Sequence, residues 1–208
     1  TYIEGITRIT AEDVTYANKL GYRIKHLGVA RRTDKGIEQR VHPTLIPERR
    51  LIANVDGVMN AVLVKGDAVG PTLFYGAGAG SEPTASAVVA DIIDVVRTMT
   101  TDPTHRVPHL AFQAGQLVDT PILPIEEVET SFYLRMRADD RPGVLAEITK
   151  ILGDRQISIE AFLQQEPKPN ETQVTIIMLT HKVREGNMIE ALAAIEALNS
   201  ICGEVTRI

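Results

Sequence analysis

The sequence contains almost no cysteine and no tryptophan, since Cys202 is the single cysteine among 208 residues. A lone cysteine excludes an intrachain disulfide and any metal site built from several thiolates. Its neighbours, Ile201 and Gly203, favour a small core residue over a nucleophile. Because chains without disulfides are typical of reducing compartments, the sequence predicts a cytoplasmic protein.

An excess of basic charge and long apolar runs are missing as well. The 22 lysines and arginines are outnumbered by 27 aspartates and glutamates, giving a formal net charge of −5. This balance disfavours nucleic acid and anionic membranes as partners. No apolar run approaches the length that crosses a bilayer. The hydrophobic fraction of 44% is nevertheless sufficient for real cores, and the length allows one large or two ordinary domains.

A complete catalytic or metal-binding constellation is not evident in the sequence. The five histidines do not cluster with carboxylates at metal-site spacing. His105 and His109 are four residues apart, but nearby prolines disfavour a helix there. His26 and His42 fall in predicted strands and are expected to be structural. No Gly-x-Ser-x-Gly elbow occurs. The sequence therefore predicts no catalytic residue and no metal site.

The chain begins as if in the middle of a strand or loop. Residue 1 is threonine rather than methionine, and residues 2–6 resemble a strand or loop cut from a longer polypeptide. We therefore expect the rest of the fold to lie upstream, together with chemistry that this sequence lacks.

Hydrophobic patterns predict mixed helices and strands in the first hundred residues. Thr10 can cap a helix with an acidic first turn, and Gly21 can end it. The further elements expected are strands at 22–32, 36–44 and 51–55, a hairpin of 60–64 and 72–75, and a helix that ends near residue 99. Gly66 and Asp67 should supply the positive-φ turn of the hairpin. The apolar positions of the last helix predict a broad buried stripe.

Three glycines at a spacing of two residues, Gly76, Gly78 and Gly80, precede that helix. They bring backbone N–H groups and a helix N-terminus to one point with no Cβ in the way, so phosphate or a planar cofactor ring could bind there. The alternative is a tight strand-to-helix crossover that needs positive φ at Gly78 and Gly80. The spacing does not fit a dinucleotide fingerprint. Both interpretations stay open at this point.

The second half of the chain begins with a linker and continues as a repeated pattern. Periodicity is lost at 102–130, where four prolines fall, and this segment is predicted to be a linker. Strands at 131–138, 156–165, 172–181 and 201–208 then alternate with helices at 142–153 and 185–198, with a turn at 167–170. This βαββαβ order predicts a ferredoxin-like module, a four-stranded antiparallel sheet with both helices on one face. The run 174–179 is apolar on both faces, which indicates a partner on the helix-free face.

A candidate ligand site lies where the first strand of this module meets its first helix. Asp140 is a plausible N-cap, Pro142 fits the first helical turn, and Gly143 leaves N–H groups open to a small anion. With Ser158 on the neighbouring strand, Asp140 and Gly143 could bind the ammonium and carboxylate of an amino acid. The alternatives are that Asp140 is only a cap and that the module serves dimerisation alone.

Two stretches of the chain resemble known families. Asp-Asp-Arg-Pro-Gly-Val-Leu at 139–145, followed by Ile-Ser-Ile-Glu at 157–160, resembles an ACT domain, an amino-acid-binding regulatory fold. The first hundred residues resemble the C-terminal part of bacterial homoserine dehydrogenase, through the motifs at 4–6, 42–43 and 54–61 and above all the glycine-rich 76–80 with Glu-Pro-Thr-Ala at 82–85. The implied fold class is α+β: a mixed-sheet fragment of a catalytic domain (1–101), a linker (102–130) and a ferredoxin-like ACT domain (131–208).

The resemblance implies the NAD- or NADP-dependent interconversion of L-homoserine and L-aspartate 4-semialdehyde, in the biosynthesis of threonine, methionine and isoleucine. The family's dinucleotide fingerprint and catalytic lysine match nothing in this sequence. No catalytic residue is therefore carried over, and the 208-residue chain alone is predicted to be inactive.

The resemblance also implies roles for the two candidate sites. The glycine-rich turn, Gly80 above all, would close against the nicotinamide end of the cofactor. Asp140, Gly143 and Ser158 would mediate threonine feedback, and the ACT domain would make subunit contacts in a homo-oligomer, together with the catalytic sheet. The alternative from another functional class is a stand-alone amino-acid-sensing and dimerisation module without catalysis.

Overall fold

The computed structural model describes residues 1–102, 111–164 and 171–208. The chain divides into two compact units, one formed by Thr1–Pro47 and Thr120–Ile208 and the other by Glu48–Asp119. The predicted turn at 167–170 and both His105 and His109 lie outside the described residues. The predicted division into residues 1–101, 102–130 and 131–208 stays a prediction.

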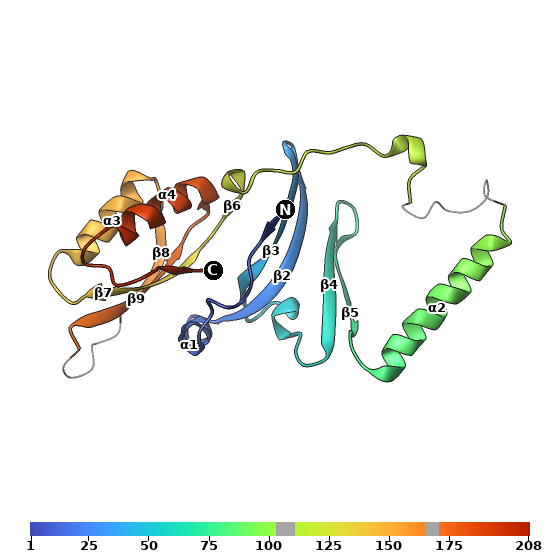
Figure 1. Cartoon of the computed structure of the whole chain (residues 1–208), viewed down its shortest axis with the longest axis horizontal. Coiled ribbons are helices and arrows are strands. Elements are labelled where there is room, and N and C mark those ends of the chain that lie inside the picture. Colours follow the sequence, from blue (N-terminus) through green and yellow to red (C-terminus); the bar gives the residue numbers. More distant parts are fainter. Residues whose placement is uncertain (103–110, 165–170) are drawn as a thin grey trace. The chain divides into compact units, whose positions relative to one another are not determined.

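The N-terminal part of the first unit is a helix beside a small sheet (Figure 1). Helix α1 (Ala11–Lys19) begins with a capping box between Thr10 and Asp13, and Gly21 follows its end with a φ of 78°. The strands are β1 (Tyr2–Ile3), β2 (Tyr22–Thr33) and β3 (Gly36–Pro47), in the order β1-β3-β2. The predicted helix after Thr10 and the predicted strands at 22–32 and 36–44 are therefore confirmed. Strand β1 was not predicted and pairs with β3 in parallel.

Residues 133–207 form the predicted four-stranded antiparallel sheet. Its elements are β7 (Tyr133–Asp139), α3 (Val144–Asp154), β8 (Ile159–Gln164), β9 (Gln173–Thr180), α4 (Glu185–Glu196) and β11 (Thr206–Arg207). The strand order is β11-β7-β9-β8, and α3 and α4 lie on one face (Figure 1). Two short strands, β6 (Glu129–Thr130) and β10 (Val183–Arg184), pair beside it. The βαββαβ fold is confirmed, although the last strand is shorter than predicted.

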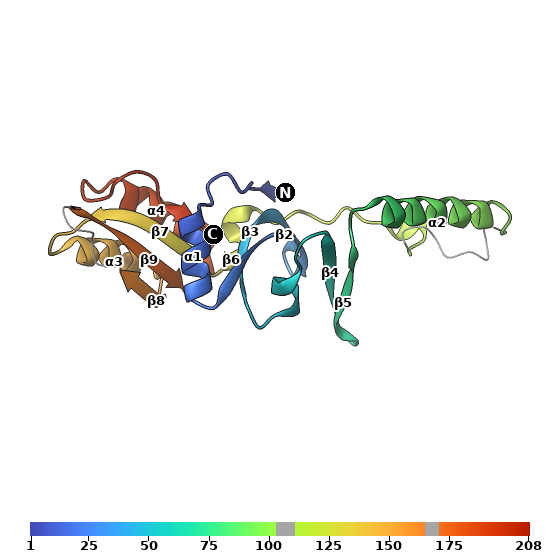
Figure 2. The same ribbon diagram turned by 90° about the horizontal axis from the view of Figure 1, so that it is seen from below.

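The other face of this sheet is covered by residues 1–47 of the same chain. Tyr133 and Ile177 point away from the helices and are buried with Tyr16 of α1 in one cluster, against which Leu20 and Leu45 also pack. Helix α1 lies beside the sheet in both views (Figure 1 and Figure 2). The inference of a separate partner for residues 174–179 was wrong, because the side chains that cover this face come from an earlier part of the same chain.

The second unit contains a hairpin and a long helix. They are β4 (Met59–Gly66), β5 (Gly70–Ala77) and α2 (Ser81–Met99), as predicted. The strand predicted at 51–55 is wrong: Leu51–Asn54 is a 3-10 helix, because the Asn54 side chain donates to the carbonyls of Glu48 and Arg50 and closes a turn. The positive φ of the hairpin turn falls on Gly70, at 74°, and not on Gly66. Two more 3-10 turns are Ala114–Gln116 and Ile125–Glu127.

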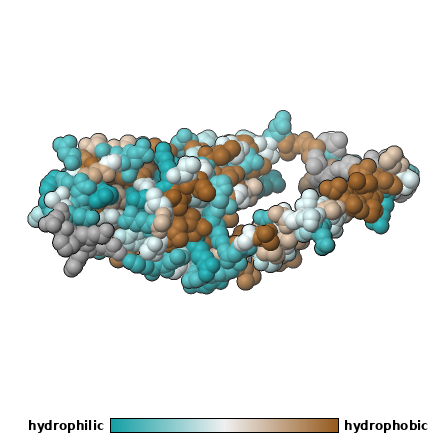
Figure 3. Space-filling model, turned by 60° about the horizontal axis from the view of Figure 1, so that its bottom comes forward, coloured by the Kyte–Doolittle hydropathy of each residue, from teal (hydrophilic) through white to brown (hydrophobic). Residues whose placement is uncertain are grey.

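The buried stripe predicted on α2 is wrong for the structure as described. None of the side chains of α2 is buried, and Ile92 is 57% exposed and Val96 55% exposed. The described residues of this unit provide no second layer that covers the apolar face of the helix. Hydrophobic surface of this kind is visible in Figure 3. None of the described helices is long and apolar enough to span a membrane.

Candidate functional site

The glycine-rich turn connects β5 to α2 and is exposed to solvent. Gly76 pairs with Asn60 in the hairpin, and the Gly78 N–H donates to the Val58 carbonyl at 2.9 Å. A Cβ on Gly78 would lie 1.2 Å from Nδ2 of Asn60, so any larger residue would collide with that side chain. A side chain at residue 78 therefore requires the exposed Asn60 side chain to move away. The alternative interpretation, with positive φ at both glycines, is wrong for Gly78 because only Gly80 has one.

Gly80 forms the N-cap of α2 with a φ of 127°, a conformation that side chains rarely adopt. The cap provides no side-chain hydrogen bond to the first turn of the helix, whose N–H groups therefore lack that intramolecular partner. Glu82 places a carboxylate in the same turn. This negative charge opposes a phosphate and favours an uncharged or cationic group. Of the two ligand types inferred from the sequence, this charge disfavours phosphate, and the planar cofactor ring stays a prediction.

The loop between β7 and α3 holds Asp140 and Gly143, both exposed. Asp140 is not the N-cap of α3, which corrects the sequence prediction. Gly143 takes that position with a left-handed φ of 94°, and its carbonyl accepts from the Glu147 N–H at 3.0 Å. The helix begins one residue after Gly143, so Asp140 is too far upstream to cap it. The Asp140 carboxylate therefore accepts no capping hydrogen bond from the first turn of α3.

Ser158 lies far from this loop within the same four-stranded sheet. Asp139 pairs with Gln173 at the start of β9, whereas Ile159 pairs with Thr180 at its end. At about 3.4 Å per residue, these ends are roughly 24 Å apart. The structure brings Asp140 and Gly143 into one loop and does not bring Ser158 to it.

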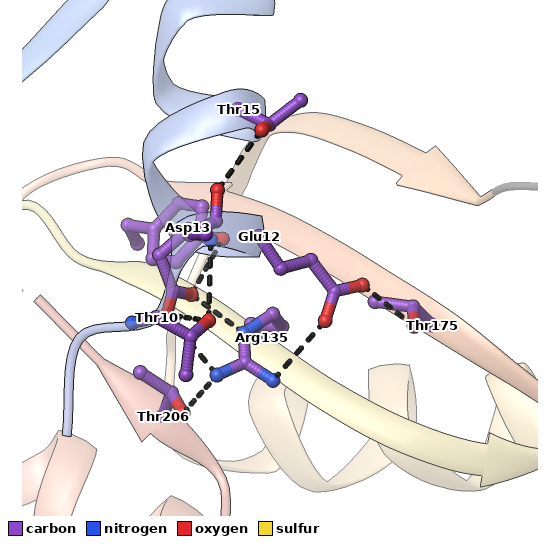
Figure 4. A network of polar contacts seen from close by, with 9 residues as sticks. Thr10, Glu12, Asp13, Thr15, Arg135, Thr175 and Thr206 are labelled. Atoms are coloured by element: carbon purple, nitrogen blue, oxygen red, sulfur yellow. Dashed lines mark hydrogen bonds and ion pairs between the residues drawn. The ribbon is translucent and has the colours of Figure 1, made fainter.

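A buried polar network joins α1 to β7 (Figure 4). The Arg135 Nε donates to Asp13 Oδ1 at 2.5 Å, its Nη2 donates to Asp13 Oδ2 at 3.1 Å, and the Tyr133 hydroxyl donates to the same carboxylate at 3.1 Å. Arg135 Nη2 also donates to Thr206. Burial raises the pKa of Asp13, but hydrogen bonds from Arg135 and Thr10 outweigh it, so this pKa lies below its ordinary value.

This network was not predictable from the sequence, although the capping box placed Asp13 at the start of a helix. The same is true of a second cluster near the end of the chain. There Arg207 donates to Glu185 and, at 2.7 Å, to the Tyr2 hydroxyl, while the Tyr2 hydroxyl donates to Glu4. Contacts such as Arg135 with Asp13, 122 positions apart, or Arg207 with Tyr2, 205 positions apart, leave no periodic signal in a sequence.

The remaining candidates have structural contacts. His26 Nε2 lies 2.9 Å from the carbonyl of Glu4, and His42 Nδ1 lies 2.7 Å from the carbonyl of Pro43. Cys202 is partly buried rather than fully in the core, and its Sγ accepts from Gln173 at 2.8 Å. Within the described residues, no group of three His, Cys, Asp or Glu side chains could hold a metal ion.

Comparisons with known proteins identify a matching family for each half of the chain. The family model "Homoserine dehydrogenase" matches residues 1–93, and the ACT domain model matches residues 132–199. A homoserine dehydrogenase of Pseudomonas aeruginosa is 61% identical over 207 residues, covering 100% of this chain and 48% of the relative. One from Neisseria gonorrhoeae is 55% identical, covering 100% of this chain and 47% of the relative.

A solved structure gives the same result. The crystal structure of a homoserine dehydrogenase from Thiobacillus denitrificans is 68% identical with a TM-score of 0.89, and the match covers 99% of this chain and 46% of that one. The chain thus spans about half the length of the relatives it matches. It belongs to the homoserine dehydrogenase family and carries an ACT domain at residues 132–199.

Proposed function

We propose that this chain contributes to a homoserine dehydrogenase that interconverts L-homoserine and L-aspartate 4-semialdehyde with NAD or NADP, in the cytoplasm. The observation that supports this most strongly is the identity of 61% to the Pseudomonas aeruginosa homoserine dehydrogenase over the full length of the chain. The fold supports it as well, because the strand, turn and helix that carry the glycines form one continuous hairpin-to-helix unit.

The glycine-rich turn is the part of this chain that would contact the cofactor. Gly80 leaves the backbone open at the start of α2, and the carboxylate of Glu82 favours the nicotinamide end over the phosphates. When bound, the nicotinamide supplies the hydride acceptor or donor of the reaction. The turn would orient the ring and exclude water from it, and the hydrogen bond from the Gly78 N–H to the Val58 carbonyl would hold the turn in place.

The ACT domain would bind an amino acid, with threonine as feedback effector, at Asp140 and Gly143. Because Ser158 lies at the other end of β9, a single ligand could contact all three residues only if Ser158 came from a second copy. Strand β8 is an edge of the ACT sheet, so its backbone is available for pairing with another chain. This arrangement favours a homo-oligomer that uses the ACT sheet, and β2, an edge strand of the sheet of β1 to β3, would offer a similar contact.

The activity is tested by grafting. This chain replaces the 207 matching residues of the Pseudomonas aeruginosa homoserine dehydrogenase, and cofactor reduction with L-homoserine is measured by absorbance. We expect the graft to be active and the 208-residue chain alone to be inactive. Gly80→Ala should raise KM for the cofactor about tenfold or more, because the positive φ is lost. Gly70→Ala is the matched control, since Gly70 also has a positive φ but lies at the hairpin turn.

The regulatory part is tested on the chain itself. Calorimetry with L-threonine should show binding, and Asp140→Ala should abolish it. An inactive graft combined with threonine binding by the 208-residue chain would favour the stand-alone sensing and dimerisation module. Activity without threonine binding would remove the feedback proposal and leave the dehydrogenase intact.

A further inference from the structure

The segment that precedes the four-stranded sheet, residues 121–130, is fixed to the protein at both of its ends. We call this segment the strap. The homoserine dehydrogenase model matches residues 1–93 and the ACT model matches residues 132–199, so neither family model covers it. The strap runs from the turn between β2 and β3 to strand β6, within the first unit (Figure 1).

The first end of the strap is bonded to β3. The Ile37 N–H donates to the Pro121 carbonyl at 2.9 Å, and the Leu123 N–H donates to the Ile37 carbonyl at 2.9 Å, which forms a short parallel bridge. Beside this bridge, Lys35 Nζ lies 2.7 Å from Glu127 Oε2. Backbone and side chain therefore both hold the strap at the turn between β2 and β3.

Gly36 sets how closely the strap approaches this turn. It is buried and has a φ of 141°, which side chains rarely adopt. A Cβ on Gly36 would lie 2.3 Å from the carbonyl oxygen of Pro121. This oxygen belongs to the backbone and cannot rotate away as a side chain can. Any larger residue at position 36 would therefore push the strap away from β3.

The second end of the strap is bonded to the start of α4. Strand β6, the last two residues of the strap, pairs with β10. The Val128 side chain is buried, and the Val128 carbonyl accepts from the Glu185 N–H at 2.8 Å. A Cβ on Gly186 would lie 3.2 Å from the Glu126 carbonyl oxygen, so helix and strap are in close backbone contact here as well.

The residues between these two anchors have hydrogen bonds of their own. Pro124 has the fixed φ of proline and precedes the 3-10 turn Ile125–Glu127. The Glu127 N–H donates to the Pro124 carbonyl at 3.1 Å, and the Val128 N–H donates to the Ile125 carbonyl at 3.0 Å. A flexible linker absorbs a displacement by changing its extension, whereas a bonded turn resists it.

We propose that the strap couples the turn between β2 and β3 to the N-terminus of α4, so that loosening of either end loosens the other. One end lies in the region matched by the homoserine dehydrogenase model and the other in the region matched by the ACT model. The coupling is carried by a contiguous chain of hydrogen bonds and is reciprocal by thermodynamic linkage. It depends neither on the cofactor nor on the effector of the proposed function.

Native-state hydrogen exchange of the unmodified 208-residue chain provides the first test. The amides of Leu123 and Glu185 report the two ends, because each donates across a strap contact. We expect both amides to show the same opening free energy and the same dependence on denaturant, as residues of one cooperative unit do. Different dependences on denaturant would show that the ends open separately and would overturn the proposal.

A substitution at the β3 end provides the second test. Gly36→Ala should raise the exchange rate of the Leu123 amide and also that of the distant Glu185 amide, each about fivefold or more. The amides of β7 and β9 should keep their rates. Gly21→Ala is the matched control, because Gly21 also has a positive φ, of 78°, but nothing lies within 4 Å of its Cβ. It should leave the Glu185 amide unchanged.

A substitution at the α4 end tests the reciprocal effect. Gly186→Val should raise the exchange rates of the Ile37 and Leu123 amides by a similar factor, because the added side chain meets the strap. Gly153→Val is the matched control in α3, where nothing lies within 4 Å of a Cβ. Should one variant fail to fold, the other and the unmodified chain still decide. Effects confined to the substituted end, or an equal rise in β7 and β9, would overturn the coupling.

Discussion

Asp13 and Arg135 form a two-pronged ion pair that joins α1 to β7 of the ACT sheet, with Asp13 fully buried and Arg135 14% exposed. Asp13 also closes the capping box of α1, so one carboxylate serves both the helix and the contact with the sheet. Removing one member of a buried pair leaves an uncompensated charge, which costs more than the pair itself contributes.

Asp13→Asn should therefore destabilise this contact by about 3 kcal/mol. Native-state hydrogen exchange at the amides of β7 and β9 measures the change in opening free energy. Glu12→Gln is the matched control: Glu12 lies 3.7 Å from the same arginine but is 44% exposed, so its replacement should cost less than about 1 kcal/mol. Equal effects of the two substitutions would contradict the assignment of the buried pair.

The same carboxylate should make the contact sensitive to acid. The pKa of Asp13 lies below the ordinary 3.8, so folding favours its ionised form. Its contribution is fully present above about pH 4 and is lost as the pH falls through the lower folded pKa. The difference in opening free energy between the wild type and Asp13→Asn should accordingly shrink between pH 5 and strongly acidic pH. A constant difference over this range would show that Asp13 does not titrate with folding.

A side chain at residue 78 should destabilise the turn, whereas one at residue 76 should not. A Cβ on Gly78 would meet the exposed Asn60 side chain, which must rotate away, so we expect a cost of about 1 kcal/mol, at the lower end of the range for overpacking. Nothing lies within 4 Å of a Cβ on Gly76, so Gly76→Ala serves as the matched control. Hydrogen exchange at the Gly78 amide, which donates to Val58, reports the difference. The double variant Asn60→Ala, Gly78→Ala should regain most of the loss; if it does not, the clash is not the cause.

The exposed apolar face of α2 should make the 208-residue chain associate with itself. Val89, Ile92 and Val96 are each more than half exposed, and contiguous apolar surface of this kind drives association. Ile92→Glu with Val96→Glu should lower the sedimentation coefficient at high protein concentration. Asp91→Glu, on the same helix, is a charge-neutral control that should change nothing. A chain that stays monomeric at every concentration would contradict this expectation.

Local features were predictable from the sequence because their causes are local. The capping box at Thr10, the antiparallel pair around residues 33–36 and the βαββαβ order all follow from side chains within a few residues of one another. The general place of the glycine-rich turn was evident for the same reason.

The errors arose where the decisive contact is specific to the folded backbone. Residues 51–54 look like a strand, but the side chain of Asn54 bonds back to two carbonyls and closes a turn. Asp140 looks like a cap, but the left-handed backbone of Gly143 delays the start of α3. The pair of Asp13 with Arg135 joins residues 122 positions apart, and no spacing rule reports such a contact.

The discontinuity of the first unit has a consequence for synthesis. Because Thr1–Pro47 and Thr120–Ile208 are both needed, a nascent chain that has emerged only as far as residue 119 cannot complete the unit. Until β9 leaves the ribosome, Tyr16 and Leu45 have no sheet against which to pack. During this interval, hydrophobic side chains of the early segment are available to chaperones, and translation of the intervening 72 residues (Glu48–Asp119) lengthens that exposure.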